Sequence, residues 1–215
     1  MTDPYIPLED TIGSVRKALL LIHRYGFGIT LHTKSNRVLR DLELLQAIHS
    51  KSKCVVQMTL TTYDDALCKK LEPNVCTTRE RIEALNQLRD AGIPTVVWLS
   101  PILPFINDTP ENILAILDSC ADTGVYGIIC FGMGLTLREG NREYFYSQLD
   151  RHFPGMKEKY IQTYGLQYQA NSPQNKPLME LFHNTCEKNG IVHNNEQIFA
   201  YLRTFEEKQT QLSLF

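Results

Sequence analysis

Apolar runs alternate with amphipathic stretches through the first part of the chain. Four runs have the length and composition of strands, and they lie at residues 29–34, 54–61, 95–100 and 126–131. Before and between them, apolar residues recur three or four positions apart, as on one face of a helix, at 8–22, 42–48, 78–91 and 110–123. Strands that alternate with helices predict parallel pairing through right-handed crossovers. We therefore predict an α/β fold.

Capping signals mark the ends of two of these helices. Thr77 and Glu80 have the spacing of a capping box, and Gly92 stands where a left-handed cap is needed. Thr109 is suited to cap the next helix, which Gly124 would end.

After residue 134 the pattern becomes wholly helical. We predict helices at 142–153, 172–189 and 194–207, with a turn near 157–164. Four parallel strands are too few to close a barrel, for which eight are typical. The sequence therefore predicts an incomplete TIM-type βα barrel at 1–138, with C-terminal helices packed on it at 139–205 and a tail at 206–215.

Two of the predicted strands carry polar residues on one face. In the first, Thr30, His32 and Lys34 alternate with apolar residues, and in the second Gln57 and Thr59 do the same. Parallel α/β folds bind ligands at the carboxyl ends of their strands. The pattern indicates either a ligand-lined interior or the solvated face of edge strands.

The composition is that of a folded, nearly neutral protein, with 22 basic and 24 acidic side chains. An overall basic field for non-specific nucleic-acid binding is absent. No apolar run approaches the roughly 18 to 20 residues that cross a bilayer, and the first residues lack a signal-peptide pattern, so we expect a cytoplasmic protein with no membrane partner. The six cysteines fit neither a zinc ribbon nor a disulfide scaffold, which predicts reduced, buried thiols.

Seven short segments follow one another along the chain. They are Thr-Asp-Pro-Tyr at 2–5, Thr-Lys-Ser at 33–35, Thr-Thr-Tyr-Asp at 61–64, Leu-Glu-Pro at 71–73, Glu-Arg-Ile at 80–82, Ala-Gly-Ile-Pro at 91–94 and Pro-Ile-Leu-Pro at 101–104. Together they resemble the radical S-adenosylmethionine proteins of the spore photoproduct lyase-like branch, often described as DNA repair photolyases. The resemblance implies S-adenosylmethionine and a [4Fe-4S] cluster as cofactors and a nucleic acid as substrate.

The cysteines depart from that family. Its members carry C-x3-C-x2-C, three thiolates that hold the cluster, and this sequence contains no such triplet. The cluster is therefore not supported by the cysteines present. In the family the Thr-Asp-Pro-Tyr segment ends the second strand, so we expect the chain to lack the first strand, the cluster loop and most of the second strand.

The resemblance also implies a set of cofactor contacts, although it assigns no catalytic residue. Lys34 resembles the lysine that pairs with the methionyl carboxylate, and either Thr59 or Thr61 resembles the hydroxyl contact to the ribose. Asp3 and Tyr5 occupy the family's loop near the cofactor's amino group. The other expected contacts, toward the methionyl and adenine ends, are Ser100, Pro101, Ile102 and Phe131.

Other polar and aromatic residues favour structural roles. Glu72 precedes a proline and is interpreted as a helix end, with Arg81 as its ion-pair partner. We interpret His32 as a hydrogen-bonded interior histidine, with a pocket-lining role as the alternative. We interpret Trp98 as a core residue, with a base-stacking platform as the alternative.

The last five residues carry a second signal. Gln211, Leu212, Ser213, Leu214 and Phe215 resemble the pentapeptide with which bacterial polymerases and repair proteins dock on the sliding clamp. Leucine and phenylalanine anchors on an extended tail suit an apolar groove. A self-packed terminus is the alternative.

Three functions remain open from the sequence. The first is a radical S-adenosylmethionine lyase-like protein, incomplete and not catalytic in this form. The second is a non-enzymatic module that forms a homodimer through its sheet edge and binds the clamp through its tail. The third is an iron-independent α/β enzyme that acts on a small molecule.

Overall fold

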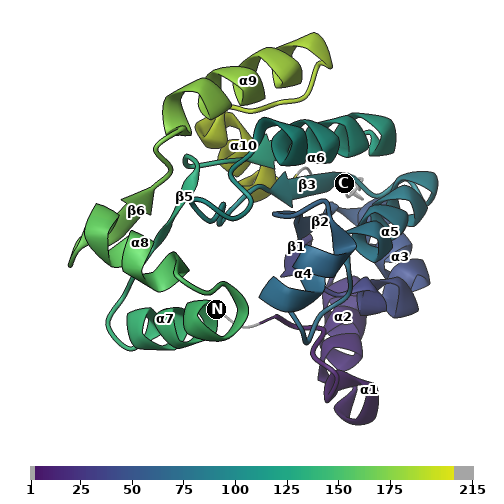
Figure 1. The fold of residues 1–215 in the computed structure, drawn as a ribbon. Helices are drawn as coiled ribbons and strands as arrows, with labels where there is room; N and C mark the ends of the chain where they lie inside the picture. The colour runs from purple at the N-terminus through teal and green to yellow at the C-terminus, as the bar shows by residue number, and fades with distance from the viewer. Residues whose placement is uncertain (1–2, 206–215) are drawn as a thin grey trace, which may run out of the picture.

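The computed structural model describes residues 3–205. Its centre is a sheet of four parallel strands in chain order (Figure 1), which confirms the predicted α/β fold. The strands are β1 (Ile29–Thr33), β2 (Cys54–Thr59), β3 (Thr95–Trp98) and β4 (Gly127–Ile129). The sheet does not close on itself, so the architecture is a partial TIM-type barrel, as predicted.

One face of this sheet, here called the outer face, is apolar and covered by helices. Side chains such as Val56, Met58 and Val97 are fully buried there against the helices that follow the strands. These helices are α2 (Ser14–Tyr25), α3 (Leu42–Lys51), α5 (Thr78–Asp90) and α6 (Pro110–Thr123), with α9 (Asn175–Lys188) packed on α6. The main core of the molecule therefore lies between the sheet and this helical layer.

The predicted caps are confirmed. The Thr77 side chain accepts a hydrogen bond from the Glu80 backbone, and the Glu80 side chain accepts one from the Thr77 backbone, which completes the capping box. Thr109 caps α6, and Gly124 ends it in the left-handed conformation. The helix predicted over 8–22 is instead two helices, α1 (Glu9–Ile12) and α2, because Gly13 adopts a φ of 63° between them.

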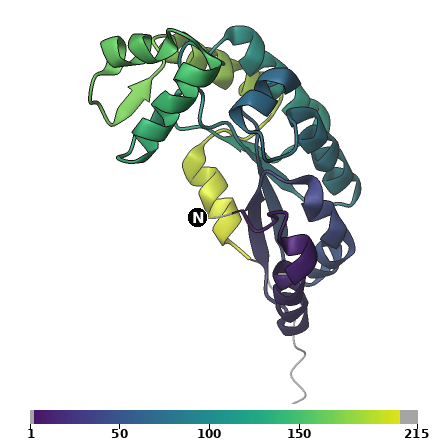
Figure 2. The ribbon, with the colours of Figure 1, turned by 60° about the horizontal axis from the view of Figure 1, so that its bottom comes forward.

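The opposite, inner face of the sheet is partly covered by α10 (Asn195–Arg203) (Figure 2). Ile198 and Leu202 of α10 pack against Val55, Val96 and Ile129 of the strands. The approach is close at Gly127, where an added Cβ would lie 2.7 Å from the carbonyl oxygen of Val192. A hydrogen bond of 2.8 Å from the Ile128 backbone to the same oxygen holds the segment before α10 beside β4.

The prediction of a wholly helical region after residue 134 is wrong. Two short strands, β5 (Gly134–Thr136) and β6 (Gln169–Asn171), pair antiparallel, and α7 (Asn141–His152) and α8 (Met156–Tyr164) lie between them. The predicted turn near 157–164 is the helix α8. Strands of three residues are too short to show an alternating pattern, and their pairing depends on residues far apart in the sequence.

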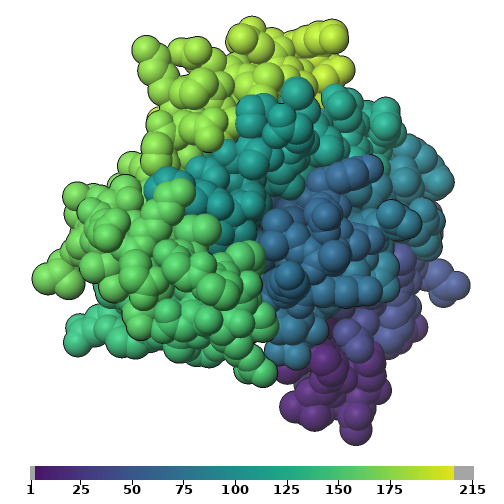
Figure 3. Space-filling view, in the orientation of Figure 1, coloured from purple at the N-terminus to yellow at the C-terminus, as the bar shows by residue number. Residues whose placement is uncertain are grey.

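This hairpin and its two helices form a unit with an aromatic core of its own, here called the α7–α8 unit (residues 134–171). Tyr160 is fully buried, with its ring 5.2 Å from that of Phe145 on α7. Its hydroxyl donates a 2.8 Å hydrogen bond to the backbone oxygen of Pro104, which ties the unit to the loop after β3. The unit therefore stands beside the carboxyl ends of the strands, and its surface (green) lies next to that of α4 (blue) in Figure 3.

The sequence analysis did not predict the 3₁₀ helix at Asn36–Asp41. Of α4 (Asp65–Leu71), which Asp64 caps, it predicted only the end at Glu72. None of the helices within residues 3–205 combines the length and apolar character needed to span a membrane.

The packing of α10 can be tested by truncating one side chain. Ile198→Ala is expected to lower the free energy of unfolding by about 3 kcal/mol, because it empties a fully buried site between α10 and the sheet. Gln197→Ala, at the exposed neighbouring position, is the control and should change it by less than about 0.5 kcal/mol. Chemical denaturation measures both. A loss below about 1 kcal/mol for Ile198→Ala would mean that α10 does not dock on the sheet.

Candidate functional site

The polar alternation of the first two strands lies on the inner face and forms one hydrogen-bonded network. The Gln57 amide donates to the Thr30 hydroxyl (2.6 Å) and accepts from the Trp98 indole (2.7 Å). His32 Nε2 lies 2.8 Å from the Thr59 hydroxyl, and its ring stacks on Trp98 at 5.2 Å. Because Gln57 and Thr59 are buried, this face is not the solvated side of an edge strand. We call these five residues the inner-face network.

The network decides the interpretation of two residues. His32 is the hydrogen-bonded interior histidine that the sequence predicts, and burial lowers the pKa of its imidazole, which favours the neutral form at pH 7. Trp98 is half-buried on the inner face, where it packs against the apolar cluster between α10 and the sheet, so it belongs to the margin of this second core. It is part of an aromatic cluster, with the rings of Phe131 and Phe199 each 6.1 Å away.

Asp3 fixes the entering chain to the end of β1. Its carboxylate accepts hydrogen bonds from the Thr33 hydroxyl (2.7 Å), the Lys34 backbone (2.6 Å) and the Tyr5 backbone (2.9 Å). The Tyr5 ring is buried, and its hydroxyl donates to Asp41. In this structure both residues therefore hold the segment before α1 in place.

Asp41 is the centre of a charged cluster behind this segment. Arg16 lies 2.7 Å and Arg40 3.0 Å from its carboxylate oxygens. Burial alone would raise the pKa of Asp41, but these guanidinium groups hold it below its ordinary value.

Lys34 and Arg81 share one carboxylate at the end of β1. Lys34 pairs with Glu72, the residue that follows α4, and Arg81 Nη2 lies 2.8 Å from the other Glu72 oxygen. Both predictions for Glu72, a helix end and an ion pair with Arg81, are confirmed. Burial alone would raise the pKa of Glu72, but the two cations hold it below its ordinary value.

The Arg81 side chain is fully buried and bonds two further groups. It donates to the backbone oxygens of Thr59 and Cys76, both at 3.0 Å. The Cys76 thiol in turn donates to the backbone oxygen of Lys34. The ends of β1 and β2, the end of α4 and the start of α5 are thereby fixed to one another.

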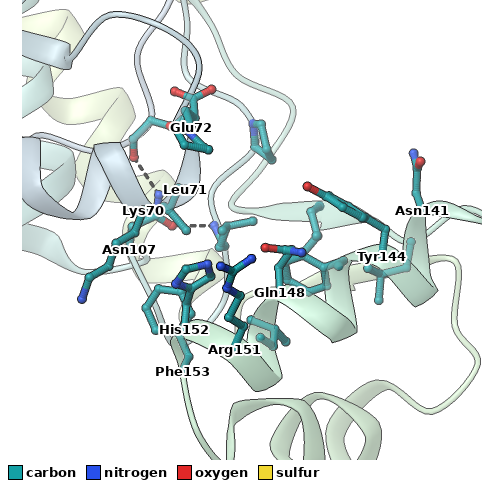
Figure 4. Close-up of a pocket in the computed structure, with 18 of the residues that line it drawn as sticks. Lys70, Leu71, Glu72, Asn107, Asn141, Tyr144, Gln148, Arg151, His152 and Phe153 are labelled. Atoms are coloured by element: carbon teal, nitrogen blue, oxygen red, sulfur yellow. Dashed lines mark hydrogen bonds between the residues drawn. The ribbon is translucent and has the colours of Figure 1, made fainter.

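A cavity of about 700 Å³ opens beside these strand ends (Figure 4). Its floor includes three of the residues that the resemblance implies, Lys34, Thr61 and Pro101. Its sides come from α4 and from one face of α7. A volume of this size is typical of small-molecule sites.

The remaining expected contacts are not brought together in the cavity. Thr59 is buried and bonded to His32, and Ile102 is fully buried in the core. Ser100 is half-buried and precedes Pro101 through a cis peptide bond. Phe131, at the end of β4, is 62% exposed on the inner face beside Trp98.

The loop after β3 holds the floor of the cavity in place. Asn107 donates to the backbone oxygen of Thr61 (2.8 Å) and accepts from the backbone of Leu103 (2.6 Å). Asn112 donates to the same Thr61 oxygen (2.9 Å). Sequence reasoning assigned no role to these asparagines, although the resemblance to the family includes Asn107.

The described residues do not fit an iron–sulfur cluster. Five of the six cysteines are buried and the sixth, Cys76, is half-buried. Burial raises the pKa of Cys54 to about 12 and that of Cys130 to about 11, whereas cluster ligands are thiolates. Within residues 3–205 no three His, Cys, Asp or Glu side chains are grouped so that they could hold a metal.

Comparisons with known proteins give the fold and distant relatives. No protein-family model matches the chain. An uncharacterized protein of Mycobacterium tuberculosis is 27% identical over 163 residues, which are 76% of this chain and 47% of that protein. A radical SAM Nα-GlyT isomerase of Pseudomonas phage M6 is 24% identical over 123 residues, which are 57% of this chain and 25% of that protein. The chain thus spans about half the length, or less, of these curated relatives.

The structure resembles that of a radical S-adenosylmethionine methyltransferase, TsrM from Kitasatospora setae. The TM-score is 0.50 with 15% sequence identity, and the match covers 85% of this chain and 41% of the methyltransferase. The partial βα barrel is therefore a fold that this chain shares with a radical S-adenosylmethionine enzyme.

Glu72→Gln tests the shared carboxylate. At pH 7 the variant should lose about 3 kcal/mol of unfolding free energy, because the Arg81 charge remains buried without its counterion. The pKa of Glu72 is lowered on folding, so its contribution is present above the ordinary value of 4.5 and is lost as the pH falls through the folded value. The difference between wild type and variant should therefore shrink in acid.

Chemical denaturation at pH 7 and at stepwise lower pH measures this difference. Glu180→Gln, at an exposed position of α9, is the matched control and should leave stability unchanged. Equal stability of wild type and Glu72→Gln at pH 7 would contradict the ion-pair assignment.

Proposed function

We propose that this chain supplies the S-adenosylmethionine-binding part of a radical S-adenosylmethionine enzyme. The observation that carries the proposal is the inner face of the sheet, where hydroxyl, imidazole and aromatic groups gather at the carboxyl ends of parallel strands. Parallel α/β folds bind their ligands at this edge. The shared fold with a radical S-adenosylmethionine methyltransferase supports the same assignment.

The aromatic cluster suits the adenine ring. Phe131, which follows β4, exposes 62% of its surface, and Trp98 and Phe199 flank it. A planar base stacked on this surface would cover an apolar group that now faces solvent.

The other cofactor contacts follow the strand ends toward β1. The Thr59 hydroxyl is already bonded to His32, whereas Thr61 lines the cavity, so we assign the ribose contact to Thr61. Lys34 is assigned to the methionyl carboxylate, where it would exchange its pairing with Glu72 for the ligand. Asp3 would then act indirectly, by fixing the backbone of Lys34.

The cluster ligands would come from outside this sequence. The thiols of the described residues are unsuited to iron, and the relatives are about twice as long as the region they share with this chain. One surface is available to a completing segment. The described residues leave the outer edge of β1 unpaired, and α2 and the turn after it expose Leu20, Leu21, Tyr25 and Phe27 beside it.

The resemblance to photoproduct lyase-like proteins extends the proposal to a nucleic-acid substrate. The net charge of −2 does not favour general DNA binding, so recognition would be confined to the cavity and its surroundings. Docking on a sliding clamp would bring the protein to DNA without a basic surface. The tail that suggests it, Gln211 to Phe215, lies outside the described residues and stays a prediction.

The exposed apolar surface beside β1 also favours a second candidate. A second copy of the chain that packed there would make the non-enzymatic dimer predicted from the sequence, and it would compete with a completing segment for the same surface.

The adenine assignment is tested by binding in the absence of iron. Isothermal titration with S-adenosylhomocysteine, a stable analogue, should show binding to the full chain, and Phe131→Ala should weaken it about tenfold through loss of base stacking. Because Phe131 is largely exposed, the variant should fold normally.

Phe27→Ala is the matched control. Phe27 is 64% exposed, and it precedes the amino end of β1, whereas the proposed site lies at the carboxyl ends of the strands. Its affinity should equal that of the wild type. Absence of binding to the wild-type chain, or equal affinities of wild type and Phe131→Ala, would overturn the assignment.

A further inference from the structure

The walls of the cavity carry an excess of positive charge. The charged side chains that line it are Lys34, Lys69, Lys70, Arg151 and one acid, Glu72. Lys34 and Glu72 neutralise each other as an ion pair. Within the described part of the chain, the other three cations form no ion pair, so their charges remain available to a ligand.

These three cations come from opposite walls. Lys69 and Lys70 lie in the last turn of α4, which the ion pair of Glu72 with Arg81 fixes to the sheet. Arg151 belongs to the last turn of α7, and Figure 4 shows it on the helix face that looks across the cavity toward Glu72. A ligand between the walls would therefore meet positive charge from two sides.

The face of α7 that lines the cavity continues with neutral polar and aromatic groups. Tyr144, Gln148 and Arg151 follow at helical spacing and lie along one side of the helix (Figure 4). The neighbouring face anchors the helix, because Phe145 packs on Tyr160 and Leu149 is buried. The cavity face is thus held in position by the core of the α7–α8 unit.

The space between the walls is apolar and suits a planar group. Leu71, Pro101, Leu103 and Phe153 line it, and Tyr144 is 69% exposed at its side. A volume of about 700 Å³ accommodates one nucleotide-sized ligand, and it is too small for a duplex.

We infer that this cavity binds a phosphate-bearing, planar ligand of nucleotide size. Arg151 binds the phosphate, with Lys70 and Lys69 opposite it, and Tyr144 stacks on the planar group. The guanidinium group offers paired donors to phosphate oxygens, and the lysines add charge. Where S-adenosylmethionine occupies the inner face, this ligand is the substrate, and in that respect the inference rests on the proposed function.

The test uses cytidine 5′-monophosphate as the probe, with cytidine as the neutral comparison. Isothermal titration of the full chain should show that the monophosphate binds at least tenfold more tightly than cytidine, and that its affinity falls with added salt. Arg151→Ala should lower the affinity for the monophosphate about tenfold and leave the affinity for cytidine unchanged. Arg151→Lys should recover part of the loss, because it keeps the charge but not the paired donors.

Lys188→Ala is the matched control, since Lys188 ends α9 and does not line the cavity. A short oligocytidylate distinguishes the source of the phosphate, because tighter binding than the monophosphate identifies a strand and weaker binding a free nucleotide. Equal affinity for the monophosphate and cytidine, or no effect of Arg151→Ala on the monophosphate, would overturn the inference.

The same variants separate this inference from the proposed function. Arg151→Ala should bind S-adenosylhomocysteine as the wild type does, and Phe131→Ala should bind cytidine monophosphate as the wild type does. If the wild-type chain binds S-adenosylhomocysteine but binds the monophosphate no more tightly than cytidine, the cavity assignment alone is refuted. If the wild-type chain prefers the monophosphate to cytidine but does not bind S-adenosylhomocysteine, the cofactor assignment alone is refuted.

Discussion

The buried charge of Arg81 is the constraint on which the site depends. A guanidinium group with no solvent exposure is very costly unless its charge is paired. Here Glu72 is the counterion, and Nε and Nη1 donate to the backbone oxygens of Cys76 and Thr59. These partners belong to different elements, so satisfying one side chain fixes the ends of α4 and β2 against the start of α5. Lys34 joins the same carboxylate from β1. The floor of the cavity is therefore ordered by electrostatics, whereas the sheet behind it is ordered by apolar packing.

The two faces of the sheet serve different purposes. The outer face carries the main core, and the inner face is divided between α10 and the polar and aromatic groups at the strand ends. The α7–α8 unit then adds a wall that no strand of the sheet provides. The result is a site with two parts. One is the exposed surface of the inner-face network and Phe131, here called the shelf, and the other is the basic cavity; they meet at Thr61, which follows β2.

The two faces of the sheet, several helix ends and one ion pair could be predicted from the sequence. Strict alternation in β1 and β2 predicted two different faces, and capping residues such as Thr77 and Thr109 located helices closely, because both signals are local. The ion pair of Glu72 with Arg81 was also predictable from their closeness in sequence. The core position of Trp98 was predicted, but its bond to Gln57 and its stacking on His32 were not, because hydrophobicity alone does not tell which polar groups lie beside a side chain.

The cavity could not be predicted in the same way. Arg151 and Lys70 are 81 residues apart, and each looks like an ordinary exposed cation on its own helix. They face each other across the cavity because β5 pairs with β6 and Tyr160 contacts Pro104. These contacts join residues far apart in the sequence and produce no periodic pattern in it. Asp3 was predicted near the cofactor, but its three hydrogen bonds to the end of β1 became visible only in the structure.

Trp98 is the only tryptophan of the chain, and it stacks on His32 within the inner-face network. All indole emission of the protein therefore arises from one position at the edge of the site, with no background from elsewhere. A protonated imidazole quenches a stacked indole, so the emission intensity follows the charge of His32 as well as any ligand that covers the shelf. The fold thus contains a built-in optical probe of its own site, which needs no label.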